Sequence, residues 1–147
     1  MRIAVASDMD TAVARAVLDE LRRRGHEPIV HGALTEGERA DWAWSCERAA
    51  RDVAEGEAEQ GVVCCWTGTG ASIAANKVGG VRAALCADAE TARGARQWNN
   101  ANVLALSLRA TSEPLLKEIL DAWFESEASP DPEDAANVQH VIELDRR

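Results

Sequence analysis

Cys65 stands at the end of an apolar run and directly before a threonine-glycine loop. Residues 61–77 read GVVCCWTGTGASIAANK. The apolar residues predict a buried strand that delivers Cys65 to its carboxyl end, and the Ala-rich residues after the loop predict a short helix. Backbone amides at the start of that helix would face the thiol and stabilise negative charge beside it. The segment therefore predicts a site where a thiolate acts on a substrate that develops an oxyanion.

The other cysteines do not form a disulfide or zinc framework with Cys65. Cys64 and Cys65 are neighbours, so in a strand they point to opposite faces, which excludes an easy disulfide between them. No C-x-x-C pair indicates zinc. We expect reduced thiols, no metal and no cofactor, with Cys64 and Cys86 as core residues.

Apolar strands and amphipathic helices alternate along most of the chain. This alternation predicts an α/β fold, a three-layer α/β/α sandwich around a Rossmann-like parallel sheet of about five strands. The predicted strands are residues 3–6, 28–30, 61–65, 81–86 and 103–106, and the predicted helices are residues 11–24, 41–54, 71–77, 89–97 and 112–124.

Ligands of such sheets bind at the carboxyl ends of the strands. We therefore expect the site to be built from residues 7–10, 31–42, 65–72, 87–90 and 98–102. Trp44 and Trp123 are interpreted as packing residues, and Arg82 and Arg109 as partners in structural ion pairs. Asn76 and Lys77 are expected to end the short helix after the loop.

The C-terminal region differs in composition from the rest. Residues 1–126 are predicted to form one domain, and residues 127–147 an acidic linker followed by a short amphipathic segment. The apolar residues of that segment, Val138, Val141, Ile142 and Leu144, are too few to support an isolated helix. The segment is expected to dock either on its own domain or on a second subunit.

Composition narrows the class of protein. The chain has 147 residues, 46% hydrophobic content and a formal net charge of −9. Its basic residues are scattered or paired with acids, so a nucleic-acid partner is not expected. No stretch approaches the roughly 18 apolar residues of a membrane span, and the first strand is too short for a signal peptide. We expect a cytoplasmic protein with no membrane partner.

Residues 56–109 resemble the core of the ribose-5-phosphate isomerase B and galactose-6-phosphate isomerase family. That family carries the pattern C-G-T-G-I-G-x-S-I-A-A-N-K, followed by G-x-R-A-A-L-C, T-A-R, H-N-D-A-N-V-L and G-x-R. The opening RIAVASD and the adjacent Asp41 and Trp42 also resemble the family's first strand and its Asp-Tyr element. The resemblance covers most of the chain.

The resemblance implies metal-independent aldose-ketose isomerisation of a sugar or sugar phosphate through an enediolate. It also implies a homodimer or homotetramer with sites shared between subunits. By position, Cys65 would be the base, with Thr67 beside it in the catalytic loop, while Asp8 and Asn99 would bind sugar hydroxyls. The remaining substrate-binding positions that we predict are Met9, Asp41, Trp42, Trp66, Gly68, Thr69, Gly70, Ser72 and Trp98.

Several residues depart from the family pattern. Met9 replaces a histidine that helps to hold phosphate, and Trp98 replaces the histidine that opens the sugar ring. Trp66 replaces a glycine, and Asn137 and its neighbours replace a His/Arg cluster. Indole cannot transfer a proton at neutral pH, but it can stack on a sugar ring. These changes predict an altered substrate, an unphosphorylated or bulkier sugar, or a cationic one.

Two alternatives stay open. The chain could be a non-catalytic protein that binds sugars or other small molecules and kept the isomerase fold. His31, which follows the second predicted strand, could replace the missing ring-opening histidine or could be an ordinary solvated loop residue.

Overall fold

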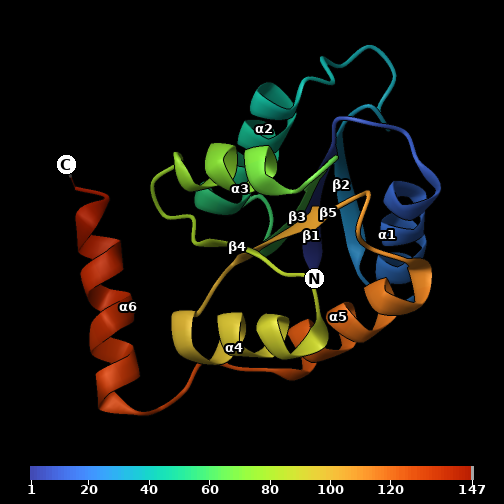
Figure 1. Cartoon of the computed structure of the whole chain (residues 1–147). Coiled ribbons are helices and arrows are strands. Elements are labelled where there is room, and N and C mark those ends of the chain that lie inside the picture. The colour runs from blue at the N-terminus through green and yellow to red at the C-terminus, as the bar shows by residue number, and fades with distance from the viewer. Residues whose placement is uncertain (147) are drawn as a thin grey trace.

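A five-stranded parallel sheet forms the middle layer of the computed structural model, which describes residues 1–146. The strand order is β2-β1-β3-β5-β4, so the sheet reverses direction of winding beside β1 and β3 (Figure 1). The strands are β1 (Arg2–Ser7), β2 (Glu27–Gly32), β3 (Gln60–Cys65), β4 (Ala83–Leu85) and β5 (Val103–Ser107). The predicted fold class and number of strands are confirmed.

Helices cover both faces of the sheet, and a further helix stands apart. Figure 1 shows α2 and α3 on one face and α1, α4 and α5 on the other. The helices are α1 (Ala12–Arg23), α2 (Trp42–Ala54), α3 (Thr69–Asn76), α4 (Ala89–Asn99), α5 (Glu113–Glu125) and α6 (Pro132–Leu144).

Side-chain alternation along the central strands assigns residues to two cores. Cys64 lies in the core under α1, α4 and α5, which contains the large residues of the protein, among them Leu104 and Trp123. Cys65 lies in the core under α2 and α3, where most side chains are alanine or valine. The prediction that the two cysteines point to opposite faces is therefore confirmed. Small side chains let α3 approach the sheet closely beside Cys65.

The fourth strand is shorter than the sequence predicted. Residues 81–86 were expected to pair, but the ladder contains only Ala83–Leu85. Arg82, directly before β4, does not join the ladder. Its backbone N–H donates to the Asn102 side chain at 2.7 Å, and its carbonyl accepts from the N–H of Asn102 at 3.0 Å. The apolar residues of the sequence continue beyond the ladder at both ends, so the predicted strand was too long.

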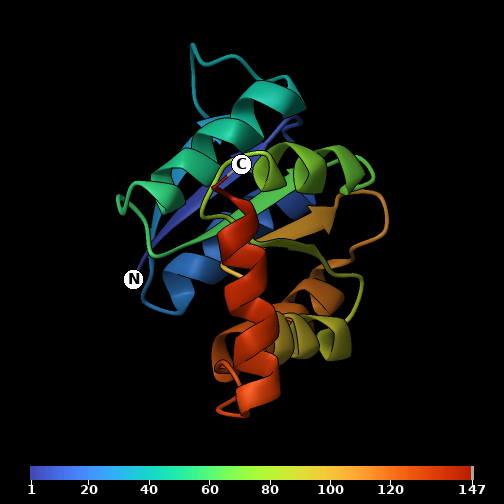
Figure 2. The same ribbon diagram turned by 90° about the vertical axis from the view of Figure 1, so that its left-hand side faces the viewer.

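Helix α6 lies outside the two helix layers. None of its described residues is buried, and its main contact is with α4. Figure 2 shows it running along the side of the molecule. Its ends are fixed by the bond from Ser129 N–H to the Gln97 carbonyl, 2.8 Å, and by the bond from Gly80 N–H to Asp145 Oδ2, also 2.8 Å.

Trp44 and Trp123 were both predicted to be packing residues, but only one of the two is buried. Trp123 is buried, and its indole N–H donates to Gln60 Oε1 at 2.8 Å, so this prediction is confirmed. The prediction for Trp44 is wrong, because its side chain is 50% exposed and lies under the guanidinium of Arg39. Within residues 1–146, no helix combines the length and apolarity needed to cross a membrane.

Candidate active site

Backbone amides of the loop and of α3 surround the Cys65 sulfur. β3 ends at Cys65, and the chain turns through Trp66, Thr67 and Gly68 before α3 begins. The N–H of Gly68 donates to Sγ at 3.2 Å, and the N–H of Ala71 donates to it at 3.4 Å. Both donors stabilise negative charge on the sulfur, as does the amino end of α3.

Gly68 makes this turn possible. Its φ of 80° is left-handed, and a Cβ there would lie 2.5 Å from Leu85 Cδ1 and 2.9 Å from the carbonyl carbon of Leu106. Backbone atoms cannot move aside, so only glycine fits. The close approach brings the loop against β5 and fixes the Gly68 amide under the sulfur.

The threonines and Trp66 form the outer side of the same loop. The hydroxyls of Thr67 and Thr69 are 2.7 Å apart and hydrogen-bonded. The Trp66 carbonyl accepts from Ser107 Oγ and from the N–H of Arg109, both at 3.0 Å, while the indole is 52% exposed. The backbone at Trp66 is therefore anchored to the end of β5, and its side chain is available to a ligand.

Two carboxylates lie at the same edge of the sheet. Ser7 pairs with Cys64 in the ladder, so Asp8 follows at the carboxyl end of β1, beside the end of β3. Asp8 Oδ1 is buried and has no hydrogen-bond partner among residues 1–146. Burial raises the pKa of Asp8, its own backbone N–H opposes this shift, and the nearby charge of Asp41 adds to it. Asp8 is thus an unsatisfied acceptor at this edge.

Trp42 and Met9 flank the loop. Trp42 is the first residue of α2, and its ring lies against Gly70, where a Cβ would be 2.9 Å from Cδ2. Met9 is exposed, and its carbonyl accepts from Ser7 Oγ at 2.6 Å. Of the predicted positions, the structure gathers at this edge Asp8, Met9, Asp41, Trp42, Cys65, Trp66, Thr67, Gly68, Thr69, Gly70 and Ser72.

Trp98 and Asn99 lie at the opposite edge of the sheet. The prediction that residues 98–102 join the carboxyl edge is wrong, because α4 runs back along the sheet and these residues lead into the start of β5. Asn102 accepts from the N–H of Gly61, at the beginning of β3, at 3.0 Å. The length of β5, roughly 13 Å from Val103 to Ser107, separates the two edges.

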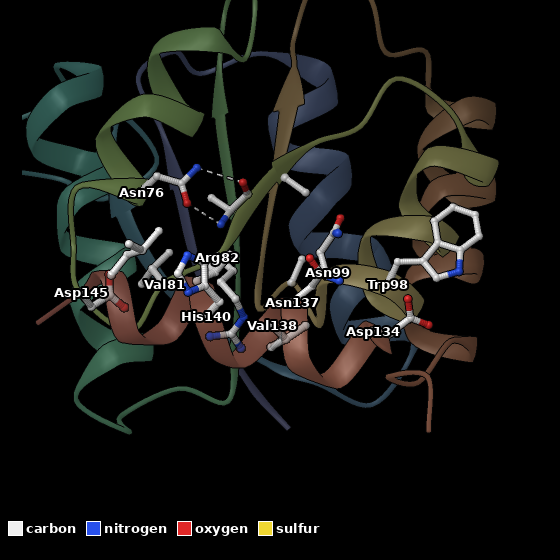
Figure 3. A pocket seen from close by; sticks show the side chains of 15 residues that line it. Asn76, Val81, Arg82, Trp98, Asn99, Asp134, Asn137, Val138, His140 and Asp145 are labelled. Carbon is white, nitrogen blue, oxygen red and sulfur yellow. Dashed lines mark hydrogen bonds between the residues drawn. The ribbon is translucent and has the colours of Figure 1, made fainter. Parts of the chain in front are cut away.

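At that opposite edge, α6 and the body of the protein enclose a groove of about 650 Å³ (Figure 3). Trp98 and Asn99 form one end, Arg82 lies at the floor, and Asp134, Asn137 and His140 come from α6. Sequence reasoning had given Arg82 only an ion-pair role. Its position in the groove follows from the loop that precedes β4, which no sequence pattern revealed.

Comparison with known proteins agrees with this arrangement of loop and sheet. The family model described as Ribose/Galactose Isomerase matches residues 3–141. The chain belongs to the ribose/galactose isomerase family. By that membership it is an aldose-ketose isomerase, as the sequence resemblance implied.

Individual relatives cover most of the isomerase chain. The galactose-6-phosphate isomerase subunit LacB of Clostridium acetobutylicum is 38% identical over 128 residues, which are 87% of this chain and 73% of that one. The ribose-5-phosphate isomerase B of Escherichia coli is 41% identical over 107 residues, 73% of this chain and 71% of that one. The solved ribose-5-phosphate isomerase B of Clostridium thermocellum has a TM-score of 0.90 at 37% identity, covering 99% and 98% of the two chains.

The other three cysteines of the isomerase differ from Cys65 in their surroundings. Burial raises the pKa of Cys46 and of Cys86 to about 12, and it also raises the pKa of Cys64. These three sulfurs therefore stay protonated at neutral pH. Within the described residues 1–146, Cys65 is the one cysteine whose sulfur accepts from two backbone amides.

His31 is not available as a ring-opening residue. Its Nδ1 is 3.1 Å from Glu38 Oε1, and its Nε2 is 2.6 Å from Asp52 Oδ2. Both ring nitrogens are thus engaged by carboxylates, and the alternative raised from the sequence is wrong. Asn76 also has a structural role, since its side-chain amide bonds to the N–H and C=O of Ala83 at 2.8 and 2.9 Å.

Within residues 1–146, Arg82 and Arg109 do not form the ion pairs that the sequence predicted. Arg82 Nε donates to the Asn100 carbonyl at 2.9 Å, and Arg109 is exposed beside the anchored Trp66. Residues 1–146 contain no group of three or more His, Cys, Asp or Glu side chains arranged to hold a metal ion.

Proposed function

We propose that this isomerase interconverts an aldose and a ketose with Cys65 as the base that moves a proton between adjacent carbons. The observation that carries the proposal is the pair of amide bonds to Cys65 Sγ, from Gly68 at 3.2 Å and Ala71 at 3.4 Å. A thiolate held in this way accepts the carbon-bound proton, and the neighbouring carbonyl oxygen takes the charge of the enediolate. The same sulfur then returns the proton to the adjacent carbon.

The loop supplies donors for the enediolate oxygen. The hydrogen-bonded hydroxyls of Thr67 and Thr69 are exposed on the outer side of the loop, where one of them can donate to an oxyanion. A preorganised donor of this kind typically contributes ~3 kcal/mol to the transition state. Asp8, with its unpartnered Oδ1, would accept a hydrogen bond from a sugar hydroxyl.

We further propose that a second copy of the chain completes each site. Trp98 and Asn99 are at the opposite edge from Cys65 in one chain, so they reach a substrate at Cys65 only from a partner. The apolar side chains at both edges support this, because Trp66 and Ile73 are 52% and 59% exposed at one edge and Trp98 and Val141 are 54% and 47% exposed at the other. A symmetric dimer would bury both sets and create two sites.

The substrate is proposed to differ from ribose 5-phosphate. Two cations near the Cys65 edge are already paired, since Arg15 bonds to Asp10 at 2.6 and 2.7 Å and Arg39 bonds to Asp41 at 2.7 Å, whereas Arg109 is exposed at this edge and forms no ion pair within residues 1–146. A phosphate dianion usually needs charge-assisted bonds of about 1.5–3 kcal/mol each. The relatives are named for phosphorylated sugars, and this chain has Met9 and Trp98 at two positions where the family pattern has histidine.

Solvent exchange measured by NMR tests the chemistry. With its sugar substrate in D₂O, the wild-type protein is expected to introduce deuterium at C1 or C2, and Cys65→Ala is expected to lower the rate at least about 1000-fold. Cys46→Ala is the matched control, because Cys46 is buried in the same core but its sulfur remains a thiol. Exchange by Cys65→Ala at the wild-type rate would refute the role of Cys65.

One observation favours a second candidate function, a sugar-binding protein without catalysis. Trp98 occupies the position of a proton-transferring histidine, and its indole cannot take up or release a proton at neutral pH. The same NMR experiment separates the two candidates. Binding of a sugar with no exchange above the Cys65→Ala background, over a panel of free and phosphorylated aldoses and ketoses, would favour this second function.

A further inference from the structure

We infer that Arg82 and Arg96 are positioning residues, which hold the turn after α4 (residues 99–102) and thereby place Asn99 in the groove. This role rests on the proposed function, in which Asn99 reaches a substrate at Cys65 of a second chain. The two arginines act on the substrate only through Asn99.

The backbone of this turn is held in an uncommon conformation. Asn100, which ends α4, has φ 43° and ψ 44°, and within residues 1–146 it is the one residue other than glycine with a positive φ. Such a conformation costs energy for a residue with a side chain, and it persists where surrounding contacts fix it. The end of a helix also leaves main-chain carbonyl groups without partners. The direction in which Asn99 is presented therefore depends on what binds the carbonyls of the turn.

Two arginines from different parts of the chain bind those carbonyls. Arg82 Nε donates to the Asn100 carbonyl at 2.9 Å, and Arg96 Nη1 donates to the Ala101 carbonyl at 2.5 Å. Arg96 belongs to α4 itself, whereas Arg82 directly precedes β4. The turn is thus tied both to the helix that it ends and to the segment that enters the sheet.

The main chain at Arg82 is itself fixed. Its N–H donates to Asn102 Oδ1 at 2.7 Å, and its carbonyl accepts from the N–H of Asn102 at 3.0 Å. The Asn102 side chain also donates to the Gly80 carbonyl at 2.9 Å. Arg82 therefore reaches the turn from a rigid base, and Figure 3 shows it lining the same groove as Asn99.

Burial makes the two cations costly to place here. Burial lowers the pKa of Arg82, an effect that the charge of Asp145 opposes. Burial also lowers the pKa of Arg96, the charge of Arg82 lowers it further, and Glu127 opposes both. Two like charges near one another in a partly buried place disfavour the folded state. What the pair provides in return is the fixed geometry of the turn.

That geometry controls how well Asn99 binds. Its side-chain amide can donate to a sugar hydroxyl and accept from one. A hydrogen bond of about 2.9 Å is lost when its two atoms move roughly 1 Å further apart, so a loose turn weakens the contact. Loss of a bond made equally to substrate and transition state raises KM and leaves kcat unchanged. Damage to folding has the other signature, because less active protein lowers the apparent kcat at constant KM.

Steady-state kinetics of Arg82→Met and Arg96→Met test the inference, since methionine keeps much of the side-chain volume and removes the donor. The probes are D-ribose 5-phosphate, D-galactose 6-phosphate and D-erythrulose 4-phosphate, for which relatives are named, together with free D-ribose and D-galactose. For the sugar that the wild type converts fastest, each variant is expected to raise KM about tenfold and to change kcat less than about twofold.

Two further substitutions at Arg82 separate the hydrogen bond from the charge. Glutamine has a nitrogen where arginine has Nε, so Arg82→Gln should restore most of the wild-type KM although the charge is gone. Lysine keeps the charge but has a carbon at that place, so Arg82→Lys should behave like Arg82→Met. Arg93→Met is the matched control, because Arg93 lies on the same helix in a surface pair with Glu90 at 2.7 Å. It should leave both constants unchanged.

A double variant shows whether the effect runs through Asn99. Arg82→Met combined with Asn99→Ala should have the KM of Asn99→Ala alone, because a side chain that is absent cannot be misplaced. Fully additive effects on KM would overturn the inference. So would wild-type KM in both methionine variants, or a wild-type KM in Arg82→Lys beside a raised one in Arg82→Gln.

Hydrogen exchange measured by mass spectrometry tests the turn without any substrate. Amides of residues 99–103 are expected to exchange at least about tenfold faster in Arg82→Met and Arg96→Met than in Arg93→Met. Equal exchange rates in the three variants would overturn the inference, whatever the kinetics show. Faster exchange with no turnover of any probe by the wild type would instead count against the proposed function for those sugars, while the hold on the turn stands.

Discussion

The Cys65 loop and the groove beside Trp98 are built by different means. In the loop, main-chain amides reach the sulfur, and close backbone contacts around Gly68 leave no room for another residue. In the groove, the ligand-facing groups are side chains on the outer surfaces of α4 and α6. A substitution in the loop disturbs the backbone, whereas a substitution in the groove changes only what the surface offers to a ligand.

The contrast between main-chain contacts in the loop and side chains in the groove explains which residues match the family pattern and which do not. Thr67, Gly68 and Gly70 match the pattern, and Trp98 and Asn137 do not. Trp66 is an exception within the loop, and it is a tolerated one because its indole points to solvent while its carbonyl makes the structural bonds. Chemistry fixed by the main chain is retained, and recognition by side chains is free to change.

Gly68→Ala is expected to have the largest effect, and it tests the Cys65 loop, which is held by backbone contacts. The new Cβ would meet Leu85 Cδ1 at 2.5 Å and the backbone of β5 at 2.9 to 3.0 Å, so the loop must move and the Gly68 amide leaves the sulfur. We expect a fall in kcat/KM of at least about 100-fold and a loss of about 3 kcal/mol in the free energy of unfolding.

Gly37→Ala is the control for backbone strain alone. Gly37 has the same φ of 80°, but nothing lies within 4 Å of its Cβ position. It should cost only about 1 kcal/mol of stability and leave kcat/KM unchanged. Equal effects of the two substitutions on activity would show that the close approach at Gly68 does not matter for the site.

Mixing two inactive variants tests whether the two regions meet across a dimer. Cys65→Ala damages one edge and Asn99→Ala the other, so each homodimer is expected to have little activity. In an equal mixture refolded together, half of the dimers carry both chains and half of their sites are intact. About a quarter of wild-type activity should therefore return.

The activity of the mixture relative to its unmixed components is the measurement. A mixture of wild type with Cys65→Ala is the reference for refolding yield, because half of its sites are intact whether or not the subunits exchange. Activity of the Cys65→Ala and Asn99→Ala mixture equal to the mean of the two separate variants would contradict a shared site and would leave Trp98 and Asn99 remote from the chemistry.

The sequence predicted well those features that depend on local pattern. The alternation of strands and helices identified the parallel sheet, and strand periodicity placed Cys64 and Cys65 in separate cores. The threonine-glycine loop after a strand predicted the amide contacts to Cys65, because a parallel strand followed by a helix turns at the carboxyl edge.

Features that depend on chain direction and tertiary contact were missed. Residues 98–102 were placed at the wrong edge because they follow a helix, and the chain returns to the amino edge before β5 begins. The sequence could not show that His31 is unavailable for ring opening, because its ring bonds to Asp52, 21 residues away. The groove could not be predicted, because it exists only where α6 and β4 come together in space.

The smallest expected effect concerns Asp8, whose side-chain Oδ1 is buried without a hydrogen-bond partner among residues 1–146. Burial raises its folded-state pKa above the ordinary value of 3.8. Above pH 3.8 the unfolded chain loses this proton more readily than the folded one, so stability falls as pH rises from 3.8 through the folded pKa, and the cost persists at neutral pH. Asp8→Asn should remove that cost and raise Tm at pH 7 by at most about 4 °C, with the difference vanishing below pH 3.8.

Asp10→Asn is the control with the opposite sign. Hydrogen bonds from Arg15 lower the pKa of Asp10, so its charged form contributes stability above pH 3.8 that disappears as pH falls through the folded pKa. Asp10→Asn should therefore lower Tm slightly at pH 7 and leave it unchanged in acid. Thermal denaturation of both variants between pH 3 and pH 8 makes the comparison. A fall in Tm for Asp8→Asn at pH 7 would mean that the Asp8 carboxylate is satisfied within the fold, and the edge beside Cys65 would then have no open acceptor for a sugar hydroxyl.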